Sequence, residues 1–310
     1  MTVTDLPTPL VRAADDAQAQ PGGQEPNRRS VSQFNQYAKC PKSYKLARID
    51  NVWQRPAAWL PQGTAFHAVL EAVEKGLHEG RDVTLEKALA LFDREYAKDI
   101  NALTAITPNF EWWSASGPYR GREDVERRWA IGREQIEKFF SWRFDKGQTI
   151  WITPDHKPAV ELNFDMILGE DPSCPVHVHG LKDDDCECGH RVRVVGFIDV
   201  VVEVGGELLI RDYKTGNTPG DDFQLGVYAL AIRKKYGVEV WSGDYYMAGK
   251  KGKPGKPTAP YDLSEWTEEA VTARFAELEE NIQAGRFDPD PEPSKCAFCD
   301  VSYSCEDQAG

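Results

Sequence analysis

Two acids and a lysine lie in a stretch whose pattern predicts a β-hairpin, residues 194–214. Val and Ile dominate its first half, a Gly-Gly pair supplies a two-residue turn, and its second half is typical of a returning strand. Asp199 falls on the first strand, while Asp212 and Lys214 fall two apart on the second, so the pleat points these last two side chains to one face. We therefore expect two carboxylates and one ammonium group to converge.

Such a carboxylate pair favours hard divalent cations. Mg²⁺ and Mn²⁺ prefer oxygen ligands, keep several waters and bridge to phosphate oxygens. A lysine beside them would stabilise the charge that accumulates on an attacked phosphate, so the natural reaction is hydrolysis of a phosphodiester. The alternative is a solvated hairpin with ordinary surface charges.

The order of these residues resembles the PD-(D/E)XK nuclease superfamily, and within it the RecB-type exonucleases. Asp212-x-Lys214 follows a Gly-x-x-Asp199 strand, and Gln224 and Tyr228 lie four apart on a following helix. The resemblance implies an α/β fold with a restriction-endonuclease-like mixed sheet flanked by helices. It also implies that the two Asp residues bind the metal, Lys214 assists catalysis, and the Gln-Tyr helix engages DNA. Simple packing is the alternative for Gln224 and Tyr228.

Two further residues are candidates for the metal site. His67 and Glu71 lie four apart on one face of a predicted helix, and the pattern Gly-x-x-x-His-x-x-x-Glu is similar to the first motif of the family. That similarity implies that His67 reaches the metal; a surface histidine and a Glu71 salt bridge are the alternatives. Glu161, on a predicted strand over 160–168, matches a strand-borne acid that RecB-type nucleases often place near the metal, and is a secondary candidate.

Four cysteines stand at opposite ends of the chain. Cys296, Cys299 and Cys305 have a Cys-x-x-Cys spacing suited to one metal centre, and thiolates select zinc or an iron–sulfur cluster. Together with Cys40, which precedes a proline, the pattern resembles AddB-type nucleases and CRISPR-associated RecB-like exonucleases. The resemblance implies a 4Fe–4S cluster that pins the two ends of the domain together. The alternative is four reduced, buried thiols.

A Cys/His-rich insertion spans about residues 171–190. Four of its side chains could bind zinc tetrahedrally, namely Cys174, His177, Cys186 and Cys188. No family motif supports this set, and an exposed polar loop explains the same residues.

The remaining regions are assigned by composition and periodicity. Residues 1–29 are rich in Pro, Ala, Gln, Asp and Gly and are expected to be disordered, whereas residues 30–310 are expected to form one nuclease domain. Within it, residues 84–146 are predicted to form a helical insertion whose interleaved tryptophans and arginines would guide DNA or, alternatively, pack a helical lobe. Residues 286–310, with Cys40, would form the iron–sulfur lobe.

Bulk properties restrict the class of protein. The formal net charge of −13 over 310 residues argues against coating nucleic acid by bulk electrostatics, although a local basic groove remains compatible with a nuclease. The sequence shows no apolar stretch long enough to span a bilayer and no secretory signal, so we expect a cytoplasmic protein. It contains no Walker-type phosphate loop and hence no motor.

The carboxylate and lysine pattern predicts a Mg²⁺- or Mn²⁺-dependent nuclease, and the resemblance to CRISPR-associated and AddB-type exonucleases implies exonuclease activity on DNA with a preference for single strands. Its setting would be recombination or repair, CRISPR adaptation or phage DNA metabolism, with helicase, recombination or CRISPR-adaptation proteins as partners. The alternatives are a catalytically silent DNA-binding or assembly subunit that retains the nuclease fold, and a zinc-stabilised interaction protein.

Overall fold

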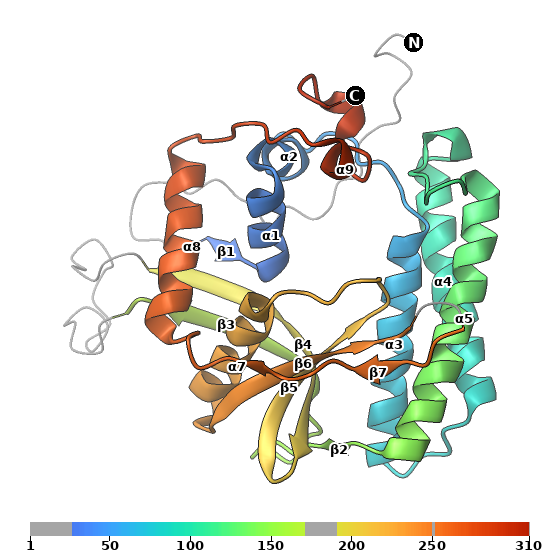
Figure 1. Ribbon diagram of the computed structural model, residues 1–310, viewed down its shortest axis with the longest axis vertical. Coiled ribbons are helices and arrows are strands. Elements are labelled where there is room, and N and C mark those ends of the chain that lie inside the picture. The colour runs from blue at the N-terminus through green and yellow to red at the C-terminus, as the bar shows by residue number, and fades with distance from the viewer. Residues whose placement is uncertain (1–26, 171–190, 250–251, 310) are drawn as a thin grey trace. The chain divides into compact units, whose positions relative to one another are not determined.

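Figure 1 shows a computed structural model of the chain, which describes residues 27–170, 191–249 and 252–309. The chain divides into two compact units, each assembled from segments far apart in the sequence. The first unit takes its residues from Met1–Gln54, Asn163–Gly196 and Glu265–Gly310, and the second from Arg55–Leu162 and Phe197–Ser264.

Helices dominate the described residues up to Lys146, and most of the strands follow, with α7 and α8 between and after them. The helices are α1 (Val31–Lys39), α2 (Pro41–Tyr44), α3 (Trp59–His78), α4 (Leu85–Ile106), α5 (Gly121–Lys146), α7 (Asp222–Tyr236), α8 (Glu268–Gln283) and α9 (Pro293–Cys296). The strands are β1 (Arg28–Arg29), β2 (Thr149–Ile150), β3 (Val160–Leu168), β4 (Val192–Val204), β5 (Glu207–Lys214), β6 (Val240–Met247), β7 (Lys256–Pro257) and β8 (Tyr261–Asp262).

The predicted hairpin is the centre of the second unit. Strands β4 and β5 pair antiparallel from Val200↔Arg211 to Val204↔Glu207, and the Gly-Gly turn between them adopts φ values of 64° and 87°, which glycine tolerates without strain. Strand β5 also pairs with β6, in parallel, so the sheet is mixed. The predicted α/β fold with a mixed sheet flanked by helices is confirmed.

Three long helices pack side by side in the second unit (Figure 1). Helices α3, α4 and α5 enclose a core with one face of the hairpin, to which Leu209 and Tyr213 of β5 contribute. Because side chains alternate along a strand, Asp212 and Lys214 project from the opposite face of β5, where Gln224 of α7 contacts both. The prediction of helices over 84–146 is confirmed, with a break between α4 and α5.

Gly132 of α5 permits the closest approach in this helical core. A Cβ atom at this position would lie 2.0 Å from Cζ of Phe92, whose fully buried ring stacks on Tyr96.

The substitution Gly132→Ala tests this packing. Helix propensity favours it by ~1 kcal/mol, but overpacking costs about 1–3 kcal/mol, and here the clash is severe. We expect a net loss of about 1–2 kcal/mol in the free energy of unfolding, measured by urea denaturation. A second change, Phe92→Leu, should restore part of it; equal stability of Gly132→Ala and wild type would contradict the close packing.

Helix α7 covers the sheet next to the hairpin. Its N-cap, Asp221, accepts a hydrogen bond from the backbone N–H of Gln224 at 3.3 Å, and its inward residues, such as Leu225 and Val227, are fully buried. Packing of α7 against β5 and β6 therefore holds Gln224 and Tyr228 in fixed positions.

The first unit joins the two ends of the chain. Ser30 caps α1 through a capping box with Gln33, as the sequence partly predicted. Strand β1 pairs with the start of β4, and Arg29 forms a buried ion pair with Glu279 of α8 at 2.7 Å. The predicted disorder of residues 1–29 is therefore wrong for Asn27, Arg28 and Arg29, and residues 1–26 lie outside the described residues.

Helix α8 begins later than its sequence suggests. The amphipathic pattern of residues 264–285 predicts a helix capped by Ser264, whereas α8 begins at Glu268 and the Thr267 side chain caps it. The N–H of Ser264 instead donates to the Asp262 carboxylate at 2.9 Å, so the chain turns there before it enters α8. Among the described helices, none is both long and apolar enough to cross a membrane.

Candidate active site

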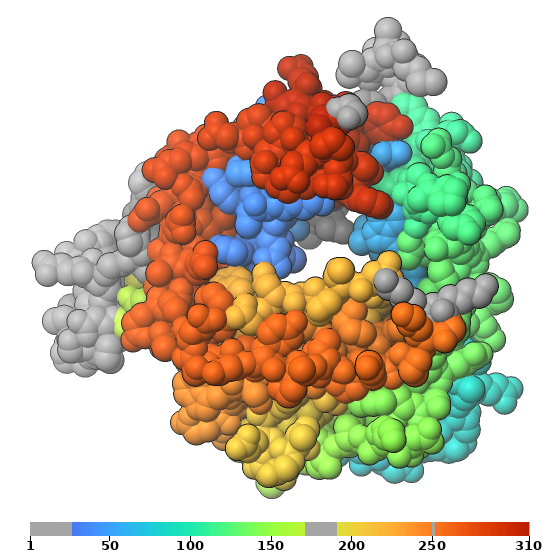
Figure 2. All heavy atoms as spheres, viewed as in Figure 1, coloured from blue at the N-terminus to red at the C-terminus, as the bar shows by residue number. Residues whose placement is uncertain are grey.

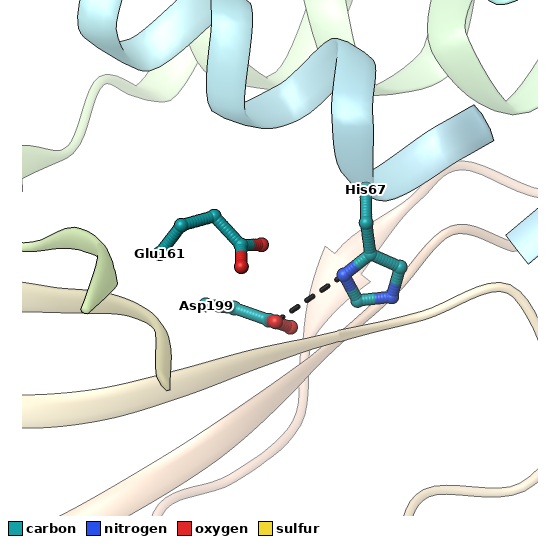
Figure 3. A group of neighbouring side chains, drawn as sticks. All are labelled: His67, Glu161 and Asp199. Carbon is teal, nitrogen blue, oxygen red and sulfur yellow. Dashed lines mark ion pairs between the residues drawn. The ribbon is translucent and has the colours of Figure 1, made fainter. Parts of the chain in front are cut away.

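Three donor groups from different elements meet at one point in the second unit. His67 of α3, Glu161 at the start of β3 and Asp199 of β4 each place one ligand atom within 4.8 Å of the others (Figure 3). The imidazole Nδ1 of His67 lies 3.2 Å from Oδ1 of Asp199. Glu161, a secondary candidate from the sequence, thus joins the group directly, and its positive φ of 49° marks the local irregularity of β3 that places it there.

Asp212 and Lys214 lie beside this group on β5. The Lys214 ammonium is 2.8 Å from Oδ2 of Asp212, and Gln224 joins both side chains. Its amide nitrogen donates to Oδ1 of Asp212 at 2.8 Å, while its amide oxygen accepts from Lys214 at 3.2 Å. Tyr228 completes the set, since its hydroxyl lies 2.9 Å from the same amide nitrogen.

The backbone of β5 also orients Asp199. The N–H of Tyr213, the residue between Asp212 and Lys214, donates to Oδ2 of Asp199 at 2.7 Å. One hydrogen bond thereby ties the acid of one strand to the segment that carries the other two charged groups. Asp199, Asp212 and Lys214 thus lie close together on the hairpin.

The carboxylates around His67 favour the protonated form of its imidazole. Burial lowers its pKa, but the charge and hydrogen bond of Asp199, with the charges of Asp212 and Glu161, raise it to about 9. Because the folded pKa lies above the usual 6.5, this group stabilises the fold fully below pH 6.5, and the stabilisation is lost as pH rises through 9.

We therefore expect the His67 imidazole of the metal-free protein to titrate near pH 9 when followed by NMR. A metal ion needs the neutral imidazole, so Mg²⁺ should compete with the proton and bind more tightly as pH rises. Asp199→Asn removes the charge that raises the pKa and is the control, with an expected shift to lower pH. A wild-type titration near pH 6.5 would contradict the contact.

The donor set fits a hard divalent cation. Burial, followed by the charge of Asp199, raises the pKa of Glu161 to about 7, and the same two causes raise the pKa of Asp212. Within the described part of the chain, the buried Oδ2 of Asp212 has no well-aligned hydrogen-bond donor, and the Lys214 ammonium lies 2.8 Å from it. Crowded, under-neutralised carboxylates of this kind suit Mg²⁺ or Mn²⁺.

Comparison with known proteins agrees with this geometry. A sequence model of the PD-(D/E)XK nuclease superfamily matches residues 28–306, a span that contains every residue of the site. The chain belongs to the PD-(D/E)XK nuclease superfamily.

Two proteins of similar sequence come from phages. The protein is 57% identical over 297 residues to Gene 69 protein of Mycobacterium phage L5, covering 89% of this chain and 95% of that protein. It is 59% identical over 278 residues to Gene 69 protein of Mycobacterium phage D29, covering 89% and 96% respectively. A solved structure titled "Crystal structure of SSO0001" covers 93% of this chain and 89% of that chain at 12% identity, with a TM-score of 0.38 that supports no further argument.

Buried polar contacts that the sequence did not reveal support the hairpin of this PD-(D/E)XK chain. Arg211 makes a two-pronged ion pair with Asp244 of β6, both bonds being 2.7 Å long. Glu74 of α3 accepts from Arg143 and Gln148, and Gln148 also contacts the Tyr213 hydroxyl at 3.0 Å. In the sequence, such contacts are indicated by a charged residue, such as Glu74, at an inward position of an apolar helix face.

A second network reaches the end of β5. Gln135 of α5 donates to the carbonyl of Thr215 at 3.0 Å and accepts from Gln62 of α3 at 2.7 Å; both glutamines are buried. Arg128 binds the oxygen of Gln62 and pairs with buried Asp124. These hydrogen bonds anchor Thr215, the residue after Lys214, to the helical core of the second unit.

Some arginines of the helical insertion form internal ion pairs. Arg127 pairs with Asp124 at 3.1 Å, and Arg133 pairs with Asp93. Arg120 and Arg122, by contrast, are exposed near the start of α5. A DNA-guiding role for the insertion therefore depends on the exposed pair rather than on all its arginines.

The four predicted cluster cysteines all lie in the first unit of this PD-(D/E)XK protein. Each is free and half-buried; Cys299 and Cys305 pack on Leu46 and Ala47, and the N–H of Asp290 donates to Sγ of Cys40 at 3.5 Å. Figure 2 shows the C-terminal residues, in red, against the first helices, in blue. Early and late segments of the described chain therefore pack together in the first unit.

The sulfur atoms are spaced widely. Among the described residues, only the His67 group has three ligand atoms within 4.8 Å of one another, so Cys40, Cys296, Cys299 and Cys305 are not clustered at that distance. The other proposed thiolate site, formed by Cys174, His177, Cys186 and Cys188, lies outside the described residues.

Proposed function

We propose that the protein is a metal-dependent deoxyribonuclease that degrades DNA from its ends with a preference for single strands. The observation that carries the proposal is the meeting of His67, Glu161 and Asp199 beside the Asp212–Lys214 pair. Family membership supports nuclease chemistry, and the phage relatives favour a place in phage DNA metabolism.

A cation held by His67, Glu161 and Asp199, with Asp212 adjacent, would supply Lewis acidity for hydrolysis of a phosphodiester. Lys214 would stabilise the negative charge that develops on the attacked phosphate. Gln224 would keep Lys214 in place, because it accepts one of the lysine's three hydrogen bonds; Asp212 faces a second, which leaves one for a phosphate oxygen. Tyr228 would hold the Gln224 amide in the required orientation.

The test is degradation of single-stranded DNA labelled at either end, with Mg²⁺, Mn²⁺ or EDTA. We expect release of short products with a divalent cation and none with EDTA, and the label position will reveal polarity. A circular single strand is the matched control for end dependence. Loss of label without any metal, or binding of DNA without cleavage under all conditions, would refute the assignment and favour a catalytically silent subunit.

We also propose that Cys40, Cys296, Cys299 and Cys305 hold a 4Fe–4S cluster. The four thiols lie on segments of the same compact unit, from both ends of the sequence, which supports the proposal. Four thiolates suit zinc or an iron–sulfur cluster. The resemblance of their sequence spacing to that of AddB-type nucleases favours the cluster.

Iron and acid-labile sulfide analysis of anaerobically purified protein tests this cluster. Wild type should contain both, whereas Cys296→Ser and Cys305→Ser should lose them and become less stable at the chain ends. Cys188→Ser lies outside the quartet and should retain the iron. A colourless wild type that contains zinc would contradict the cluster and favour a zinc-stabilised protein.

The family match runs through segments of both compact units, and we propose that both belong to one nuclease domain. The chain carries no motor motif, so helicase, recombination or CRISPR-adaptation proteins are its proposed partners and the cytoplasm its proposed compartment.

A further inference from the structure

Phe197 is the most exposed large apolar side chain among the described residues, with 60% of its surface accessible. It lies on β4, whose neighbouring residues Ile198 and Val200 are almost completely buried. The described part of the chain offers the ring no aromatic or cationic partner. A single exposed apolar residue is ordinary on a protein surface, so its meaning depends on what lies next to it.

Its neighbour is the candidate active site. Phe197 and Asp199 are two residues apart on a continuous strand, so both side chains project from the same face, about 6.6 Å apart along the strand. Asp199 is held rigidly by the Tyr213 N–H and faces His67 and Glu161. The exposed ring therefore lies next to Asp199, which belongs to the group that would hold the metal and the phosphate.

We propose that Phe197 stacks on a base adjacent to the phosphodiester that is cut. The proposal rests on the proposed nuclease function and deepens it, because a base can reach the ring only where it is unpaired or splayed from a duplex. Any base has a face that stacks, so the contact would select single strands without selecting a sequence. A ring fixed on a strand also loses little side-chain entropy on binding.

Substrates that lack one base test this contact. A set of single-stranded oligonucleotides, each with one abasic nucleotide at a successive position from either end, is compared in single-turnover cleavage by wild type, Phe197→Ala and Phe197→Trp. Val204→Ala is the matched control, because Val204 is 54% exposed at the far end of the same strand. Metal-free binding of the same oligonucleotides, by fluorescence anisotropy, provides a readout that does not require cleavage.

On intact DNA, Phe197→Ala should lower kcat/KM and affinity by about 5- to 100-fold, whereas Phe197→Trp and Val204→Ala should resemble wild type. One abasic position should weaken wild type by the same factor and leave Phe197→Ala unaffected. Equal losses on intact and abasic DNA, or no loss at all, would overturn stacking while wild type still cuts. Absence of both cleavage and binding in wild type would instead overturn the nuclease proposal, and stacking with it.

Discussion

Asp212→Asn is expected to lower the rate of phosphodiester hydrolysis by about 10²- to 10³-fold or more. The amide keeps the size of the side chain and can still contact Gln224, but it removes the charge that faces Lys214 and the candidate metal site. Loss of one group that stabilises transition-state charge typically costs this much. Single-turnover cleavage of end-labelled DNA at saturating Mg²⁺ measures the effect.

The stability of the same variant separates chemistry from folding. Burial, and then the charge of Asp199, makes ionised Asp212 unfavourable in the folded state, as its raised pKa indicates. The Tm of the metal-free variant should therefore equal or exceed that of wild type. Asp82→Asn, which changes an exposed acid paired with Lys87, is the control and should leave rate and Tm unchanged. A variant of Asp212 that is inactive and also strongly destabilised would indicate a structural role.

Asp244→Ala is expected to have the largest effect on stability. It leaves the buried Arg211 guanidinium without its two-pronged partner, and breaking a buried ion pair costs about 3–5 kcal/mol. At roughly 2–4 °C per kcal/mol for a unit of this size, the Tm should fall by about 6–20 °C in a thermal scan.

Two further variants make this prediction specific. Asp82→Ala removes one partner of an exposed pair and should cost less than about 1 kcal/mol. Replacing both buried partners, Arg211→Met with Asp244→Leu, should recover most of the lost stability, because no charge is left buried. If the double variant is as unstable as Asp244→Ala, the network around Gln148 rather than the charge pair explains the loss.

The hairpin was predictable because its signals are local. Val/Ile-rich strands, a Gly-Gly turn and the two-residue period locate Asp199, Asp212 and Lys214, and β4 and β5 follow that prediction. The family resemblance identified Gln224 and Tyr228 as site residues, whereas helical periodicity alone would have assigned them to packing. The cap of α1 at Ser30 is equally local.

Contacts between distant segments were harder to anticipate. Glu161 looks like any outward-facing acid on a strand, and only the backbone irregularity at the start of β3 turns it toward His67. The ion pair of Arg211 and Asp244 depends on the parallel register of β5 and β6, which no sequence period specifies. The spacing of the cysteine sulfurs likewise depends on how the first and last segments fold together.

Each of the four residues from Arg211 to Lys214 has a specific structural or chemical role. Two of them face the chemistry, one lies in the core, one neutralises a buried aspartate, and the backbone between them orients Asp199. A change of substrate preference, whether by natural drift or in the laboratory, therefore has little room in this segment. We expect tolerated diversity among relatives to accumulate at exposed positions outside the site, such as Val204.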